Sequence, residues 1–159
     1  MPVTNNVTRM LEAKKIKFRA IALPEEKLGA QEAAELIGVP AGQVFKTIVA
    51  VRTTPGKPIL AVVPGNREVD LKLLAKAVGE KKIKLASHQQ AESITGLQTG
   101  GISPLALINK GFQIFVDQTA QTHTAIYISG GQRGLNIEID PMDLVKITNA
   151  RIADLCSLK

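Results

Sequence analysis

The stretch Val44-Phe-Lys-Thr-Ile-Val-Ala-Val51 has the clearest strand pattern in the chain, because it is rich in β-branched residues and lacks glycine and proline. A turn over residues 53–58, which contains two prolines and a glycine, leads from it into a second apolar run over residues 59–63. Successive side chains of a strand point to opposite faces, and both faces of residues 44–51 are apolar. We therefore expect this strand to be buried on both sides.

The rest of the chain alternates between helix and strand patterns. Apolar spacing and capping residues predict helices over residues 4–15, with Thr4 as the cap, 31–37, 71–78, 88–95 and from 141 onward. Strand patterns occupy residues 18–23, 82–86, 112–116, 125–129 and 135–139. This mixture, without repeats or linkers, predicts one α+β (mixed α/β) domain over residues 1–159 with a mixed β-sheet surrounded by helices.

The composition excludes several classes of protein. The chain has 159 residues, of which 45% are hydrophobic and 21% charged, and these values are typical of a globular protein rather than a disordered one. No run approaches the roughly 18 apolar residues of a membrane span, and the first nine residues contain no apolar signal core. We therefore expect a cytoplasmic protein that does not bind membranes.

The charge balance is basic. Twenty Lys and Arg residues oppose fourteen Asp and Glu residues, which gives a net charge of +6 and suits a polyanionic partner such as nucleic acid. Four Phe, one Tyr and no Trp are too few for a platform that stacks bases. Lys72 and Lys76 lie four residues apart and share a helix face, so they are candidates for binding the phosphates of a nucleic acid; a solvated surface is the alternative. Further basic residues cluster at Lys14, Lys15, Lys17, Arg19, Lys81, Lys82 and Lys84.

Lys46 is the anomaly of the strand over residues 44–51. A lysine between apolar neighbours loses hydration free energy unless an anion or several acceptors meet its ammonium group. A functional role with an anionic ligand is one interpretation, although charged residues that only prevent aggregation are common in strands. The alternative is that the strand lies at a sheet edge, where a charged side chain prevents aggregation.

Two glycine-containing loops are the other candidates for chemistry. Gly100-Gly-Ile-Ser-Pro104 can bring backbone N–H groups close to a ligand oxygen, or it is an ordinary turn. Gly130-Gly-Gln-Arg-Gly134 joins two strands as a hairpin turn, and its Arg133 can contact a phosphate.

The remaining reactive side chains show no catalytic or metal-binding spacing. His88 and His123 are isolated, and there is no pair of cysteines for zinc, so we expect no metal and no other cofactor. Cys156 follows Ile152 and Leu155 at helical spacing, which predicts a buried small hydrophobic residue rather than a nucleophile.

Three motifs occur in order: Phe45-Lys46-Thr47, the loop Gly100 to Pro104, and Tyr127-Ile-Ser-Gly-Gly-Gln-Arg-Gly134. Together they resemble the YbaK family of aminoacyl-tRNA deacylases, and they are similar also to the editing domain inserted in bacterial prolyl-tRNA synthetases. The resemblance implies a single domain with a mixed, bifurcated sheet. It also implies trans-editing, the hydrolytic removal of a wrong amino acid from tRNA, most typically cysteine from the proline tRNA.

The resemblance assigns roles to residues of this chain. Lys46 and Gly101 take catalytic roles: Lys46 meets the terminal phosphate or the ester, and the amides of the glycine loop stabilise the oxyanion. The substrate's own thiol attacks its ester carbonyl and leaves a cyclic thiolactone. The implied substrate-binding positions are Thr47, Gly100, Ile102, Ser103, Pro104, Ser129, Gly130 and Gly131.

The amino-acid specificity is a separate question. Two positions that carry aromatic rings in cysteine-specific members are Leu23 and Leu28 here. A changed pocket wall alters discrimination by only about 1–3 kcal/mol per methylene, so another small amino acid is an alternative substrate. A non-catalytic module that binds tRNA or a synthetase is the alternative from a different class. The expected partners are the acceptor end of aminoacyl-tRNA and prolyl-tRNA synthetase.

Overall fold

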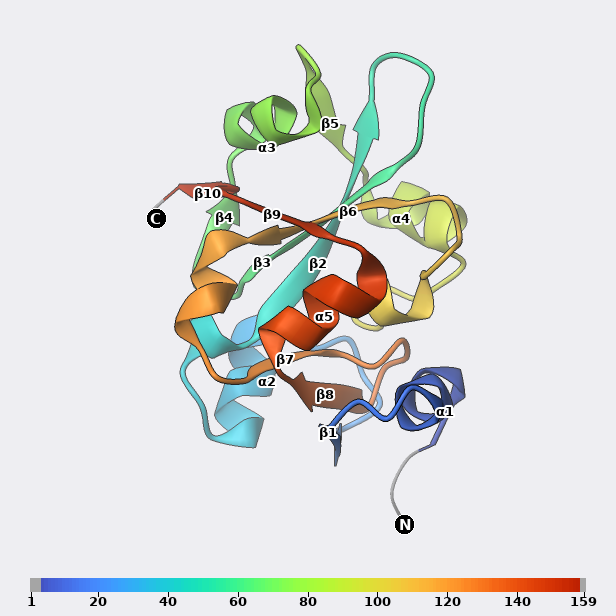
Figure 1. The fold of residues 1–159 in the computed structure, drawn as a ribbon, viewed down its shortest axis with the longest axis vertical. Helices are drawn as coiled ribbons and strands as arrows, with labels where there is room; N and C mark the ends of the chain where they lie inside the picture. Colours follow the sequence, from blue (N-terminus) through green and yellow to red (C-terminus); the bar gives the residue numbers. More distant parts are fainter. Residues whose placement is uncertain (1–3, 158–159) are drawn as a thin grey trace.

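The computed structural model describes residues 4–157, and its centre is a mixed sheet of five strands in the order β5-β2-β3-β6-β9 (Figure 1). Strand β2 runs antiparallel to β3 and β5, whereas β3, β6 and β9 are parallel to one another. The strands are β2 (Phe45–Arg52), β3 (Ile59–Pro64), β5 (Ile83–Leu85), β6 (Gln113–Asp117) and β9 (Arg151–Ala153).

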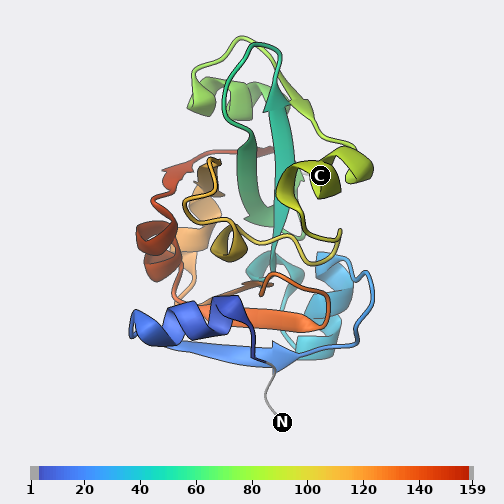
Figure 2. The same ribbon diagram turned by 90° about the vertical axis from the view of Figure 1, so that its right-hand side faces the viewer.

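A second, antiparallel sheet lies across one end of β2 (Figure 2). It has the order β1-β8-β7 and consists of β1 (Phe18–Ala22), β7 (Ile126–Ser129) and β8 (Leu135–Ile139). A parallel bridge between Val44 and Tyr127 links it to the start of β2. The chain therefore connects two diverging sheets at residue 44, which confirms the expected α+β fold with a mixed, forked sheet.

Strand β3, rather than β2, is the strand that is buried throughout. All six residues of β3 are buried, whereas Lys46, Thr47 and Ile48 of β2 are partly exposed. The reason is pairing: β5 reaches only Ala50–Arg52, so the first half of β2 has β3 on one side and no strand on the other. The expectation of a fully buried strand over residues 44–51 is wrong for this half.

Helices cover the sheets as the local sequence predicts. They are α1 (Asn6–Ala13), α2 (Ala30–Ile37), α3 (Leu71–Val78), α4 (His88–Thr95) and α5 (Pro141–Thr148), with short 3-10 turns at Ala41–Gln43, Pro104–Ala106 and Gln118–Thr122. Asp70, Ser87 and Asp140 cap the starts of α3, α4 and α5 with their side chains. The cap of α1 is Asn5 and not Thr4, because the Asn5 amide also donates to the carbonyl oxygen of Gly130 at 2.9 Å.

The C-terminal end is extended, which corrects the helical spacing inferred for residues 152–156. Strand β10 (Cys156–Ser157) pairs with β4 (Glu68–Val69), and the carboxylate of Asp117 accepts a hydrogen bond from the Leu155 N–H at 2.8 Å. Cys156 is buried, as predicted. In the described part of the chain, no helix combines the length and the apolar character needed to cross a membrane.

Two core clusters fill the two sides of the central sheet. Leu60 and Val62 of β3 face one cluster, and Ile59, Ala61 and Val63 face the other. The second cluster includes Leu74 and Ala75 of α3 together with Cys156.

Candidate functional site

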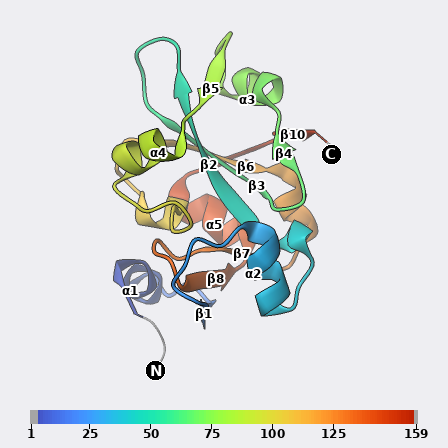
Figure 3. The same cartoon turned by 180° about the vertical axis from the view of Figure 1, so that it is seen from behind.

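A pocket of about 570 Å³ lies beside β2, between α2 and the start of α4. Figure 3 shows how these three elements are arranged. Its walls come from residues 27–33, 44–49, 85–91 and 99–102, with Ser129 and Asn136 contributed by the β7–β8 hairpin. It occupies the place where β2 lacks a second strand neighbour. The gap in the sheet therefore creates the pocket.

The edge of β2 gives this pocket a row of backbone polar groups. The carbonyl oxygen of Val44 accepts a hydrogen bond from Gly65 N–H at 2.7 Å, and antiparallel pairing alternates along the strand. The backbone groups of Lys46 and Ile48 consequently face β3, and those of Phe45 and Thr47 face the pocket. Farther along, the carbonyl oxygen of Val49 points the same way and accepts from Ala86 N–H at 2.9 Å.

The structure brings six of the predicted site residues to this pocket and leaves the others outside its lining. The lining residues are Leu28, Lys46, Thr47, Gly100, Ile102 and Ser129. Gly101, Ser103 and Pro104 are buried below the loop surface, and Gly130 and Gly131 form the turn after Ser129. Leu23 packs instead into the cluster around Tyr127, and Lys72 and Lys76 are exposed on α3.

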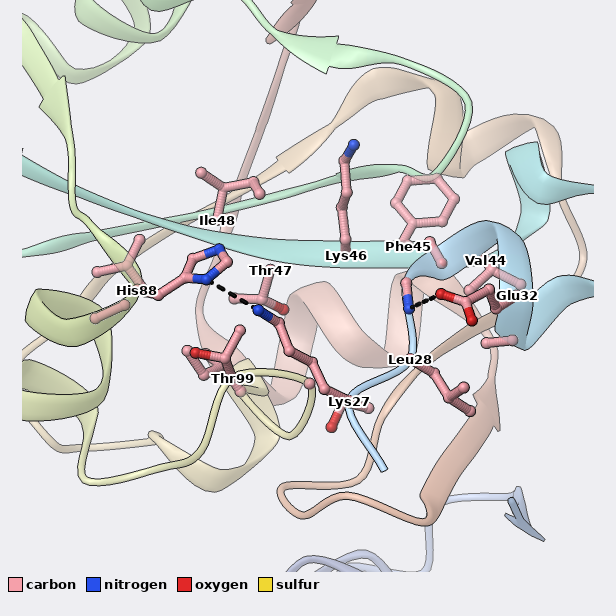
Figure 4. A pocket seen from close by; sticks show the side chains of 18 of the residues that line it. Lys27, Leu28, Glu32, Val44, Phe45, Lys46, Thr47, Ile48, His88 and Thr99 are labelled. Carbon is pink, nitrogen blue, oxygen red and sulfur yellow. Dashed lines mark hydrogen bonds between the residues drawn. The ribbon is translucent and has the colours of Figure 1, made fainter. Parts of the chain in front are cut away.

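Lys46 has an anionic partner within the protein. Its ammonium nitrogen lies 3.8 Å from a carboxylate oxygen of Glu68 on β4, and its side chain retains 25% exposure. Lys46 shares the face of β2 with Ile48 and Ala50, which pack in the α3 cluster. Figure 4 accordingly shows Lys46 on the side of β2 opposite to Lys27 and His88. The carboxylate that offsets the desolvation of Lys46 was not predicted from the sequence, because Glu68 belongs to a two-residue strand.

The Gly100 loop is held against the β7–β8 hairpin by close backbone contact. A Cβ atom on Gly101 would lie 2.8 Å from the Cα and carbonyl carbon of Gln132, so this position requires glycine. The Gly101 N–H donates to the carbonyl oxygen of Gln98 at 2.8 Å. Gly100 has a positive φ of 93° and lines the pocket together with Ile102. The Gly101 amide is therefore already bonded, whereas Gly100 and Ile102 line the cavity.

Side chains fix the same loop from two directions. Glu92 of α4 accepts hydrogen bonds from the N–H and the hydroxyl of Thr99, at 2.7 and 3.0 Å, and these bonds hold the pKa of Glu92 below its usual value. Arg133 donates from Nε to the carbonyl oxygen of Thr99 at 2.8 Å. Arg133, predicted to contact a tRNA phosphate, thus anchors the loop through this bond.

Three pocket residues were not among the predicted site residues, and His88 had been discounted because it is isolated in the sequence. Lys27 and His88 meet across the pocket, with 3.0 Å between Lys27 Nζ and His88 Nδ1 (Figure 4). The Asn136 side-chain oxygen is buried and has no hydrogen-bond partner among residues 4–157. No spacing signal links residues 27 and 88. Asn136 alternates with apolar residues in β8, a pattern that predicts only a solvent-facing side chain.

Comparison with known proteins identifies the family of this chain. The family model of the aminoacyl-tRNA editing domain matches residues 24–147. The chain belongs to this family. The matched region contains every residue that lines the pocket. The expectation of an aminoacyl-tRNA editing enzyme is therefore confirmed.

Individual relatives support this membership in the editing family. The chain is 39% identical over 152 residues to an Enterococcus faecalis protein named "Putative Cys-tRNA(Pro)/Cys-tRNA(Cys) deacylase EbsC", covering 94% of this chain and 92% of that one. It is 33% identical over 125 residues to a proline–tRNA ligase of Maridesulfovibrio salexigens, covering 79% of this chain but only 20% of the ligase.

Solved structures share the whole fold. The crystal structure of the hypothetical protein APE2540 superposes with a TM-score of 0.88 at 25% identity, over 96% of this chain and all of that one. A structure described as a trans-editing enzyme for prolyl tRNA synthetase superposes with a TM-score of 0.80 at 24% identity, over 98% and 99% of the two chains. The second likeness shows the fold alone.

Proposed function

We propose that this editing domain acts in trans to remove cysteine from tRNA(Pro). The pocket beside β2 carries the proposal, because it offers backbone groups of a glycine loop next to an apolar cavity. The 39% identical relative named for Cys-tRNA(Pro) and Cys-tRNA(Cys) supports the choice of substrate. The family resemblance to the prolyl-tRNA synthetase editing domain supports that synthetase as a partner.

The attacking group in this proposal comes from the substrate. The protein's own thiol, Cys156, does not line the pocket, and burial together with the charge of Asp117 raises its pKa to about 12. In the proposed step, the sulfur of the cysteinyl group bonds to its own ester carbonyl carbon. The ribose oxygen then leaves with the proton lost by the thiol, and the products are a cyclic thiolactone and free tRNA.

Pocket residues bind the reacting groups of the substrate in this proposed step. The N–H groups of Gly100 and Ile102 stabilise the developing oxyanion. The unpartnered Asn136 oxygen accepts a hydrogen bond from the substrate's α-ammonium group. Lys46 lines the pocket but extends from the opposite side of β2 toward Glu68, so in this proposal it turns around the free edge of the strand to reach the ester region. Losing the Glu68 contact costs little, because Glu68 is 63% exposed and such surface pairs contribute about 0–1 kcal/mol.

The size of the amino acid is set by the apolar wall in this proposal. Leu28, together with Ala30, Ala33 and Val44, lines the cavity, whereas Leu23 lies outside it. We therefore assign discrimination among small amino acids to Leu28 rather than to Leu23.

The test is a deacylation panel with Cys-, Ala-, Ser- and Thr-charged tRNA, run with and without prolyl-tRNA synthetase. We expect the cysteine ester to react fastest and the serine ester far more slowly, because a hydroxyl is a weaker nucleophile than a thiol near neutral pH. Lys46→Ala should reduce the rate at least tenfold, and Lys17→Ala, which removes an exposed lysine, serves as the control.

Each alternative gives a different result in the same panel. Equal rates on the cysteine and serine esters favour attack by water. Fast release of alanine or threonine instead of cysteine changes the assigned amino acid. Salt-sensitive tRNA binding that survives Lys46→Ala, without turnover on any ester, indicates a non-catalytic binding module and contradicts the proposal.

A further inference from the structure

We propose that Lys27 and His88 form a phosphate-binding subsite at the rim of the pocket, and that it holds the phosphodiester of the substrate's terminal nucleotide. This inference rests on the proposed function, because it takes an aminoacyl-tRNA end as the ligand. Neither residue belongs to the motifs that define the rest of the site. The subsite joins two separate walls of the pocket, the segment before α2 and the first residue of α4.

The hydrogen bond between the two side chains determines what they offer to a ligand. A lysine ammonium has only donors, so at 3.0 Å the Nδ1 atom of His88 accepts from Lys27 Nζ. A neutral imidazole that accepts at Nδ1 carries its proton on Nε2 and donates there. The pair therefore presents only donors: the remaining ammonium hydrogens and one imidazole N–H. Such a set fits an anionic oxygen ligand.

The positive charge of Lys27 has no carboxylate partner within residues 4–157. The ion pairs of that region are Arg19–Glu138, Lys46–Glu68 and Arg52–Glu80. The glutamates around the pocket accept hydrogen bonds from other groups, and the Glu92 carboxylate also interacts electrostatically with His88. Glu32 accepts from the Gly29 N–H at 3.1 Å, and Glu92 accepts from Thr99.

The subsite lies next to the Gly100 loop, whose N–H groups are proposed to stabilise the oxyanion. The Cα atom of Lys27 lies 3.2 Å from the position of a Cβ on Gly100, so the two backbones are in contact. In an aminoacyl-tRNA, the last phosphodiester and the amino-acid ester are attached to the same terminal ribose. An anion site beside the oxyanion loop is therefore placed where the last phosphodiester can bind. Lys46 lies on the other side of β2 and does not compete for this phosphate (Figure 4).

Two minimal substrates isolate the phosphate. Cysteinyl-adenosine lacks it, and the cysteinyl ester of the dinucleotide CpA contains it. We expect the wild-type protein to prefer the dinucleotide ester in kcat/KM. Lys27→Met should lower kcat/KM for the dinucleotide about tenfold through KM, leave the nucleoside ester within twofold, and be rescued by Lys27→Arg. Lys17→Met is the matched control for the loss of one positive charge.

A binding measurement tests the subsite independently of turnover. Adenosine 5′-monophosphate should shift the NMR signals of the His88 ring in the wild-type protein, whereas adenosine should not, and His88→Ala identifies the signals. Lys27→Met should weaken that response at least tenfold in concentration. Equal loss of activity on both esters, or equal shifts with both ligands, overturns the subsite. Failure of the wild-type protein on every cysteinyl ester contradicts the proposed function instead.

Discussion

The polar groups on the two sides of β2 differ in whether they have hydrogen-bond or ionic partners. On the side of α3, Asp117 is fully bonded, Lys46 faces Glu68, and Cys156 is buried as a neutral thiol. On the pocket side, the Asn136 oxygen has no partner, and Lys27 has a neutral histidine rather than a carboxylate beside it. The first arrangement stabilises the fold. The second leaves hydrogen-bonding capacity for a ligand, at the cost of about 1–3 kcal/mol for a buried unsatisfied group.

Asp117→Ala should have the largest effect on stability. Asp117 is buried and accepts from the N–H groups of Leu155 and Thr119 and from the Thr119 hydroxyl, so its removal leaves buried donors unpaired. We expect the free energy of unfolding to fall by about 3 kcal/mol or more in urea titrations. Asp117→Asn, which keeps an acceptor, should lose less. A loss below about 1 kcal/mol for the alanine variant contradicts this account of the α3 side.

Gly101→Ala should have the next largest effect, and it acts at the pocket. The added methyl group meets the backbone of Gln132 at 2.8 Å, so the loop must separate from the hairpin. We expect a loss of about 1–3 kcal/mol of stability together with lower deacylation activity. Gly29→Ala, whose methyl group would have an ordinary contact at 3.5 Å, is the control for stability. Equal stability of the two variants would show that the loop tolerates the shift.

Asn136→Leu should separate stability from activity. The substitution removes a buried oxygen that has no partner, so the free energy of unfolding should stay the same or rise by up to about 1 kcal/mol. Deacylation of Cys-tRNA(Pro) should fall, because the α-ammonium group loses its acceptor. Unfolding curves and kcat/KM measured on the same preparation check both parts. Unchanged activity removes Asn136 from the proposed site.

The Cys156 thiol should show almost no reactivity in the folded protein. Burial, reinforced by the negative charge of Asp117, raises its pKa to about 12, so the thiol stays protonated at pH 8. Only about one thiol in ten thousand is then ionised, and the thiolate is the reactive form. Mass spectrometry after treatment with iodoacetamide should find the native protein unmodified and the protein in guanidinium fully modified. Rapid labelling of the native state contradicts the burial of the α3 side.

Local signals predicted most helices correctly. The helices expected over residues 71–78 and 88–95 are α3 and α4; Asp70 and Ser87 cap their starts, and Gly79 and Gly96 follow their last residues in the left-handed conformation. These signals act within one helical turn, so neighbouring residues suffice to specify them. The strands β4, β9 and β10 went unpredicted because strands of two or three residues depend on a partner that is distant in sequence.

The candidate site likewise contains residues that local motifs predicted and residues that only the tertiary structure places. Motifs in the sequence indicated Lys46, Thr47 and the Gly100 loop, and of these Lys46, Thr47, Gly100 and Ile102 line the pocket. Leu23 and Leu28 looked equivalent in the sequence. The turn after β1 separates them, since Leu23 N–H bonds to Gly134 and Leu28 turns toward the cavity.

The sequence by itself determined the α+β class, the helix ends and the editing motifs, because each depends on periodicity or on a few adjacent residues. Tertiary structure alone decided which groups meet. It paired Lys46 with Glu68, bonded the Gly101 amide, and brought Lys27 to His88, 61 residues away. These contacts exist only where β2 lacks a strand neighbour and separate segments close around the gap, and no local pattern encodes that arrangement.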